Sequence, residues 1–146
     1  MSDPAEPSRP SQVAPNTGAR ASRILVIDDD DIVRRFVCRA LEISGFAVAE
    51  ATNGFEAMTL FRQFRPDAVV TDLLMPERDG IETIIELRRH APQLPILAIS
   101  GGFNAVSSIY LRTAEELGAN AVLSKPFTVE QLLAALKPLI KPAQGT

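Results

Sequence analysis

The sequence of 146 residues lacks the features of several common protein classes. It has no apolar run near the roughly 20 residues that a membrane-spanning helix needs, and no N-terminal series typical of a secretory signal. It has no block of lysine and arginine and a formal net charge of only −3, which argues against nucleic acid or an anionic membrane as a partner. Cys38 is the only cysteine, so no internal disulfide forms and we expect a reducing, cytoplasmic compartment.

The apolar residues, 46% of the chain, suffice for the core of one domain. The first 22 residues contain four prolines among small and polar residues and offer little to bury. We therefore predict a disordered N-terminal tail over residues 1–22, a folded domain over residues 23–140 and a C-terminal tail over residues 141–146.

Five short apolar segments alternate with five segments of helical periodicity inside the predicted domain. The segments expected to be strands are residues 23–27, 46–51, 68–72, 95–100 and 121–124. Alternating strands and helices require a parallel sheet covered by helices on both faces, with right-handed crossovers. The predicted fold class is therefore α/β.

Polar residues at expected helix starts support these boundaries. Asp30 and Asp31 are placed to cap the first helix, while Thr128 and Gln131 form a capping box for the last, which we expect to run to about residue 140. The residues expected to face the core are, in the first helix, Val33, Phe36, Val37, Ala40 and Leu41, and, in the third, Ile81, Ile84 and Ile85.

Four of the five expected strands deliver polar residues at their carboxyl ends. Asp28 and Asp29 follow the first strand, Asp72 ends the third, Ser100 ends the fourth, and Lys125 follows the fifth. In open α/β sheets, ligands bind outside the carboxyl ends of the strands. We therefore expect three carboxylates, a hydroxyl and an ammonium group to meet at one edge.

The chemistry of such a cluster favours a cation and a phosphoryl group. Three neighbouring carboxylates repel one another and raise one another's pKa unless a cation joins them, and an all-oxygen ligand set favours Mg²⁺. A carboxylate of this kind is a known phosphoryl acceptor. Phosphoryl transfer needs charge neutralised on three oxygens, work that Mg²⁺, Lys125 and Ser100 could divide.

Four motifs give the chain a family resemblance. They are Ile-Leu-Val-Ile-Asp-Asp-Asp, Thr-Asp-Leu-Leu-Met-Pro-Glu-Arg-Asp-Gly, Ile-Ser-Gly-Gly and Ser-Lys-Pro-Phe. In this order and spacing, over about residues 22–140, the chain resembles a response-regulator receiver domain of two-component signalling. The resemblance implies a flavodoxin-like, doubly wound (βα)5 parallel sheet with strand order 2-1-3-4-5.

The resemblance also implies a magnesium site and a phosphoacceptor. Asp72 would accept the phosphoryl group. Asp29 and Asp72 would bind Mg²⁺ directly, Asp28 would act largely through water, and the backbone carbonyl of Leu74 would be a further ligand.

Two more residues take roles through the same resemblance. Ser100 would bind the phosphoryl group and report its presence, and Lys125 would pair with phosphoryl oxygens and precede a cis proline. Two positions depart from the family's pattern. Val122 stands where many receivers have an aromatic switch residue, so the coupling of Ser100 to the surface is expected to differ, and Gly101 stands where alanine is usual.

The implied function is a phosphoacceptor signalling switch, which takes a phosphoryl group from a phosphohistidine and changes a protein-binding surface. The donor would be a sensor histidine kinase or a histidine phosphotransfer protein, and the downstream target is an unknown protein. Such a domain catalyses only its own phosphorylation and dephosphorylation and is not a turnover enzyme. Because few residues follow the last helix, we expect a stand-alone receiver.

Two alternatives stay open at this point. A haloacid-dehalogenase-like phosphatase would explain the Asp-x-Asp spacing within residues 28–31 and the order of Ser100 and Lys125. However, only Glu130 follows Lys125 where that family needs an acidic pair, and Asp72 is left without a role. The other alternative is a degenerate receiver that binds partners without being phosphorylated, although the acceptor residues are intact.

Overall fold

The computed structural model describes residues 21–73, 80–101 and 105–140. The strands are β1 (Arg23–Ile27), β2 (Ala47–Ala51), β3 (Ala68–Asp72), β4 (Ile96–Ser100) and β5 (Ala121–Ser124). The helices are α1 (Asp31–Ile43), α2 (Gly54–Phe64), α3 (Gly80–His90), α4 (Ala105–Leu117) and α5 (Val129–Leu136), followed by a 3-10 helix (Lys137–Leu139). The expected Leu74 ligand and nearly all of both expected tails lie outside the described residues. Within them, no helix is long and apolar enough to cross a membrane.

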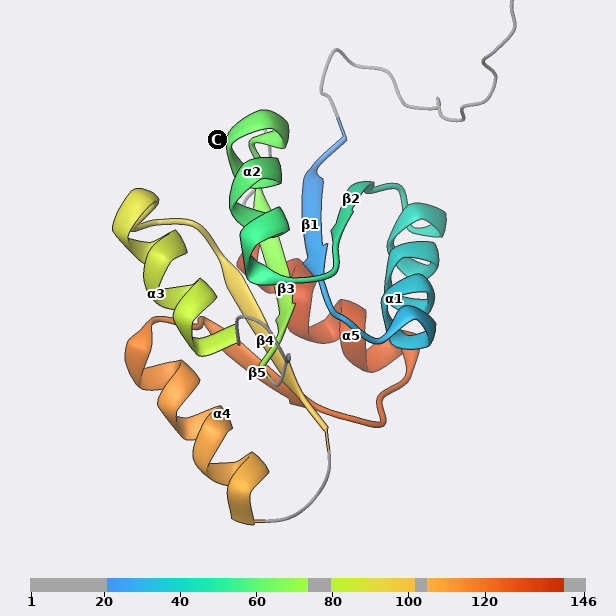
Figure 1. Ribbon diagram of the computed structural model, residues 1–146. Coiled ribbons are helices and arrows are strands. Elements are labelled where there is room, and N and C mark those ends of the chain that lie inside the picture. The colour runs from blue at the N-terminus through green and yellow to red at the C-terminus, as the bar shows by residue number, and fades with distance from the viewer. Residues whose placement is uncertain (1–20, 74–79, 102–104, 141–146) are drawn as a thin grey trace, which may run out of the picture.

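The five strands form one parallel sheet in the order β2-β1-β3-β4-β5, which confirms the predicted fold. Helices α1 and α5 cover one face, and α2, α3 and α4 cover the other (Figure 1). Each face has its own apolar core. Along β1, Leu25 and Ile27 enter the core under α2 and α3, while Ile24 and Val26 enter the core under α1 and α5.

The central strands are buried on both faces, as expected for a parallel sheet between helix layers. Every residue of β3 and β4 is buried. A shift of one residue along either strand would exchange the side chains of the two cores, so the register is strongly specified. This packing fixes the position at which each strand delivers its last residue to the carboxyl edge.

The helix caps agree with the sequence. The Asp30 side chain accepts hydrogen bonds from the Ile32 and Val33 amides, and the Thr128–Gln131 capping box is complete. The last helix ends earlier than predicted, at Leu136, with a 3-10 turn next. Pro138 explains the change, because its nitrogen has no hydrogen to donate to an α-helical bond.

Two residues expected in the core are exposed. Phe36 is 41% exposed and Ile85 is 39% exposed, whereas Ile84 is fully buried. Adjacent helical residues point about 100° apart, so Ile84 and Ile85 cannot both face the sheet. Phe36 still makes one aromatic contact, because the centroid of its ring lies 6.0 Å from the ring centroid of Phe127.

Candidate functional site

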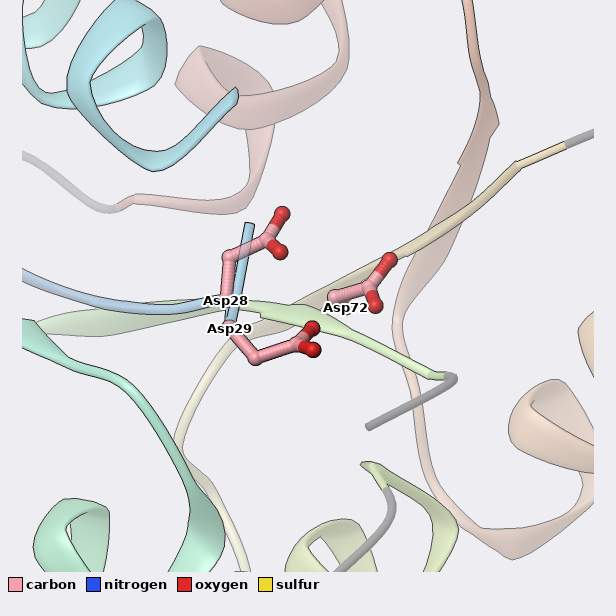
Figure 2. Close-up of side chains that lie close together, drawn as sticks. All are labelled: Asp28, Asp29 and Asp72. Atoms are coloured by element: carbon pink, nitrogen blue, oxygen red, sulfur yellow. The ribbon is translucent and has the colours of Figure 1, made fainter. Parts of the chain in front are cut away.

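Three carboxyl groups lie together at the carboxyl edge of the sheet. Strands β1 and β3 are neighbours, and Ile27 pairs with Thr71, so Asp28 and Asp72 emerge side by side. Figure 2 shows the carboxyl groups of Asp28, Asp29 and Asp72 turned to the same side of this edge. Each offers an oxygen within 4.8 Å of the others. The side chains of Asp28 and Asp72 are buried and that of Asp29 is exposed, so the cluster opens to solvent on one side.

The backbone holds this edge by hydrogen bonds that continue the sheet past its last residues. They run from Asp28 N to Ala51 O (3.1 Å), from Leu73 N to Ile99 O (2.9 Å), and from Lys125 N to Ser100 O (2.8 Å). The turns that follow the strands are therefore anchored at their first residue, which limits how far the polar side chains there can move.

Lys125 lies against two of the carboxylates. Its Nζ atom is 3.1 Å from Asp72 Oδ1 and 3.6 Å from Asp28 Oδ2. The peptide bond from Lys125 to Pro126 is cis, as the resemblance suggested. The ammonium group thus offsets part of the negative charge of the cluster from the β5 side.

Burial and repulsion shift the pKa values of the buried acids. Burial, together with the neighbouring Asp28 carboxylate, raises the pKa of Asp72 to about 6, although Lys125 opposes this. Burial also raises the pKa of Asp28. Burial by itself would lower the pKa of Lys125, but the two carboxylates together outweigh it, and its pKa is raised. The site thus favours any added positive charge.

The Ser100 hydroxyl is a buried polar group without a hydrogen-bond partner among the described residues. Ser100 is fully buried, and it follows Ile99, which pairs with Asp72 across the sheet. Buried hydroxyls are usually hydrogen-bonded, and an exception calls for an explanation such as a ligand. The sequence placed Ser100 at this edge, but only the packing shows that its oxygen has no partner within the described part of the chain.

Gly80 returns the chain to the end of β3. Its amide donates to Leu73 O at 3.0 Å. A Cβ atom at this position would collide with the Asp72 carbonyl oxygen and would lie 2.7 Å from Leu73 Cα, so only glycine fits. At Gly101, by contrast, a Cβ would lie 3.5 Å from Lys125 Cδ, an ordinary contact. The departure from alanine at Gly101 therefore has no steric cause.

Sequence reasoning missed Arg34, a buried residue that contacts this edge. It is only 7% exposed, and it donates a hydrogen bond to the backbone carbonyl of Asp28. A signal was present, because Arg34 precedes Val37, Cys38 and Leu41 at helical spacings of three, four and seven. An arginine in line with an apolar stripe indicates a paired, buried guanidinium.

Comparison with known proteins agrees with this geometry. Residues 24–137 match the model of the response regulator receiver domain family, and the chain belongs to this family. It is 42% identical over 120 residues to the response regulator MprA of a Mycobacterium species, a match that covers 82% of this chain and 50% of that protein. The chain thus spans about half the length of the curated relatives it matches.

Solved structures show the same fold. The receiver domain of NtrX from Brucella abortus superposes with a TM-score of 0.75 at 26% identity, covering 80% of this chain and 96% of that one. The chemotaxis response regulator CheY4 of Vibrio cholerae superposes with a TM-score of 0.73 at 27% identity, covering 82% and 99%. The family resemblance is thereby confirmed, and these comparisons favour neither of the two alternatives.

Proposed function

We propose that Asp72 accepts a phosphoryl group from a phosphohistidine and that the domain then changes a protein-binding surface. One observation supports this assignment above the others. The Asp72 carboxylate is buried at the end of a central strand, with the Lys125 ammonium 3.1 Å away and the oxygens of two more aspartates within 4.8 Å. No carboxylate outside this edge combines these neighbours among the described residues.

The transfer forms one bond and breaks one. A carboxylate oxygen of Asp72 attacks the phosphorus atom, an O–P bond forms, and the P–N bond to the donor imidazole breaks. The electron pair of that bond leaves with the imidazole nitrogen. The product is an acyl phosphate on Asp72, and water later attacks its phosphorus atom to release phosphate and restore the carboxylate. The domain thus acts only on itself and has no turnover substrate.

Lys125 and Ser100 are suited to receive the phosphoryl oxygens. The Lys125 ammonium already contacts the acceptor carboxylate and would follow the negative charge when it moves onto the phosphoryl group. The Ser100 hydroxyl, which has no partner among the residues that the structure describes, can donate to one of these oxygens and so gain a hydrogen bond. Both groups stabilise charge that is spread over the transferring oxygens.

The donor set fits a magnesium ion. Asp28, Asp29 and Asp72 offer only oxygen ligands, which a hard cation prefers, and their mutual repulsion favours a cation. We propose that Asp29 and Asp72 bind Mg²⁺ directly and Asp28 largely through water, with the backbone carbonyl of Leu74 as a further ligand. When bound, the ion would neutralise part of the charge on the phosphoryl oxygens.

We propose that a sensor histidine kinase or a histidine phosphotransfer protein is the donor, in the cytoplasm. The output would be a contact with another protein, and we expect neither nucleic acid nor a membrane as a partner of this domain. The surface most directly linked to Ser100 is formed by α4, β5 and α5, because Ser100 ends β4 and pairs with Ser124 of β5.

The acceptor assignment is tested by incubating the protein with Mg²⁺ and acetyl phosphate and mapping the adduct by mass spectrometry. We expect one adduct, on Asp72, and none in Asp72→Asn. An adduct on Asp28 would contradict the assignment and support the phosphatase, while no adduct in the wild type would support the degenerate receiver.

The output surface is tested by backbone NMR with and without beryllofluoride, a mimic of the phosphoryl group. We expect shift changes at Ser100, along β5 and along α4. The mimic should still bind Ser100→Ala, but the changes beyond Ser100 should diminish. Val122 provides no aromatic ring to follow the Ser100 hydroxyl. The coupling free energy between the phosphoryl site and the output surface should therefore lie near the low end of the usual range, about 1 kcal/mol. Undiminished changes in Ser100→Ala would show that the hydroxyl is not the relay.

A further inference from the structure

We propose that Arg34 is a positioning residue that holds the Asp28 backbone so that the acidic cluster is preformed for its cation. This inference rests on the proposed magnesium site. Arg34 lies in the first turns of α1 and does not belong to the cluster itself, so its contribution would be made through Asp28.

The guanidinium joins three elements. Its Nη1 atom donates to the backbone carbonyl of Asp28 at 3.0 Å, directly after β1. Its Nε atom donates to Glu50 Oε1 at 2.8 Å, on β2, and its Nη2 atom pairs with Asp31 Oδ1 at 2.7 Å, in the first turn of α1. The planar geometry of the guanidinium makes these three directions mutually dependent.

These bonds complete the fixation of Asp28. Its amide donates to Ala51 O at 3.1 Å, its carbonyl accepts from Arg34, and its Oδ1 atom accepts from the Asp30 amide at 2.9 Å. The Oδ2 atom is left directed at the site, 3.6 Å from Lys125 Nζ. Among the described residues, Arg34 is therefore the side chain that holds the Asp28 carbonyl, a backbone group that no bond of the sheet holds.

Burial indicates that this arrangement is specific. The side chain of Arg34 is only 9% exposed, and a buried charge is costly unless it is paired and hydrogen-bonded. An apolar residue at this core-facing position would avoid that cost. The neighbouring Arg35 is exposed, so the same residue type occurs at adjacent positions with and without these contacts.

Charge and geometry predict opposite effects on metal binding. If Arg34 acted only through its charge, it would repel a cation, and its removal would tighten Mg²⁺ binding. If it positions Asp28, its removal weakens Mg²⁺ binding. Arg34→Lys separates the two further, because lysine keeps the charge but loses the planar set of donors.

The test measures the Kd for Mg²⁺ in a titration that is monitored by backbone NMR, without a phosphodonor. The proteins compared are the wild type, Arg34→Gln, Arg34→Lys and the control Arg35→Gln. Loss of an outer-shell contact typically weakens metal binding about 10- to 100-fold. We expect about 10-fold weakening in both Arg34 variants, the low end of this range because Arg34 acts through the backbone of Asp28, with altered amide shifts at Asp28 and Asp29. Arg35→Gln, which removes an exposed charge, should stay within about two-fold of the wild type.

Each outcome has a distinct meaning. Unchanged or tighter Mg²⁺ binding in Arg34→Gln, or wild-type binding in Arg34→Lys, overturns the inference while leaving the magnesium site intact. Absence of Mg²⁺ binding in the wild type overturns the proposed function instead. Should Arg34→Gln fail to fold, Glu50→Ala tests the same anchor by removing the half-exposed carboxylate of the edge strand β2 that Arg34 Nε contacts. Unchanged binding in that variant contradicts the inference.

Discussion

The two ends of this one sheet treat polar groups in opposite ways. At the amino end, Asn120 Oδ1 accepts hydrogen bonds from the Ile96 amide and from Arg88, both at 2.8 Å. The same Arg88 donates to the carbonyls of Gly118 and Ala91. These groups satisfy one another, and they join the end of α3 to the turn before β5.

At the carboxyl end the buried polar groups repel one another or have no hydrogen-bond partner among the described residues. Asp28 and Asp72 are buried beside each other with raised pKa values, and the Ser100 hydroxyl has no partner among the described residues. Among the described residues, Lys125 is the only cation that forms an ion pair with both acids. Satisfied groups serve stability, whereas unsatisfied buried groups cluster at functional sites.

The largest difference in phosphorylation should come from making the same substitution, aspartate to asparagine, at the two opposite ends of β3. Asp72→Asn removes the proposed acceptor, so labelling by acetyl phosphate should be lost while the melting temperature without metal rises. Asp67, just before β3, accepts from the Arg23 amide at 2.8 Å. Asp67→Asn should keep labelling and lose about 1 kcal/mol of stability. Loss of labelling in Asp67→Asn would contradict this division between the two ends.

Stability without metal should depend on pH through Asp72. Its pKa rises from 3.8 to about 6 on folding, mainly because of burial. The folded state therefore binds the proton more tightly, and this contribution is complete below pH 3.8 and is lost as pH rises through about 6. The loss amounts to at most about 3 kcal/mol. Urea unfolding in EDTA at several pH values should show it in the wild type, with a smaller decline in Asp72→Asn. Equal declines would contradict the shift.

Truncating one polar side chain at each end of the sheet should change the free energy of unfolding by different amounts. Asn120→Ala leaves the Ile96 amide without its side-chain acceptor and removes one of the acceptors of Arg88, at a cost of about 1–3 kcal/mol. Ser100→Ala removes a hydroxyl that makes no bond among the described residues and should change stability by less than about 1 kcal/mol, toward stabilisation. Chemical denaturation without metal measures both. A large loss in Ser100→Ala would show that its hydroxyl is paired.

The smallest effect should be stabilisation by the cation. At about ten times its Kd, Mg²⁺ should add about 1.4 kcal/mol to the free energy of unfolding, seen as a rise in melting temperature. Asp29→Asn relieves repulsion, so it should melt higher than the wild type in EDTA and respond less to Mg²⁺. Identical melting of the mutant and the wild type, with and without metal, would place the cation elsewhere.

Local patterns in the sequence were enough for the order of the elements, for most of their bounds, and for placing Asp28, Asp29, Asp72, Ser100 and Lys125 at strand ends. The alternation of strands and helices, the Asp30 cap and the Thr128 capping box all follow from hydrogen bonds and periodicities that span a few residues. The polar residues at the strand ends follow as well, because parallel strands bring their carboxyl ends to one edge. The magnesium ligands and the acceptor assignment stay proposals on this basis.

Only the tertiary structure decided how each of these groups is surrounded. Four properties depend on which surfaces meet: the burial of Arg34, the exposure of Ile85, the pKa of Asp72 and the lack of a partner for the Ser100 hydroxyl among the described residues. Periodicity predicts that a helix has an inner side, but it leaves the rotation of the helix about its axis uncertain by one residue. Desolvation and pairing arise between segments that are far apart in the chain. Those quantities exist only once the layers have packed.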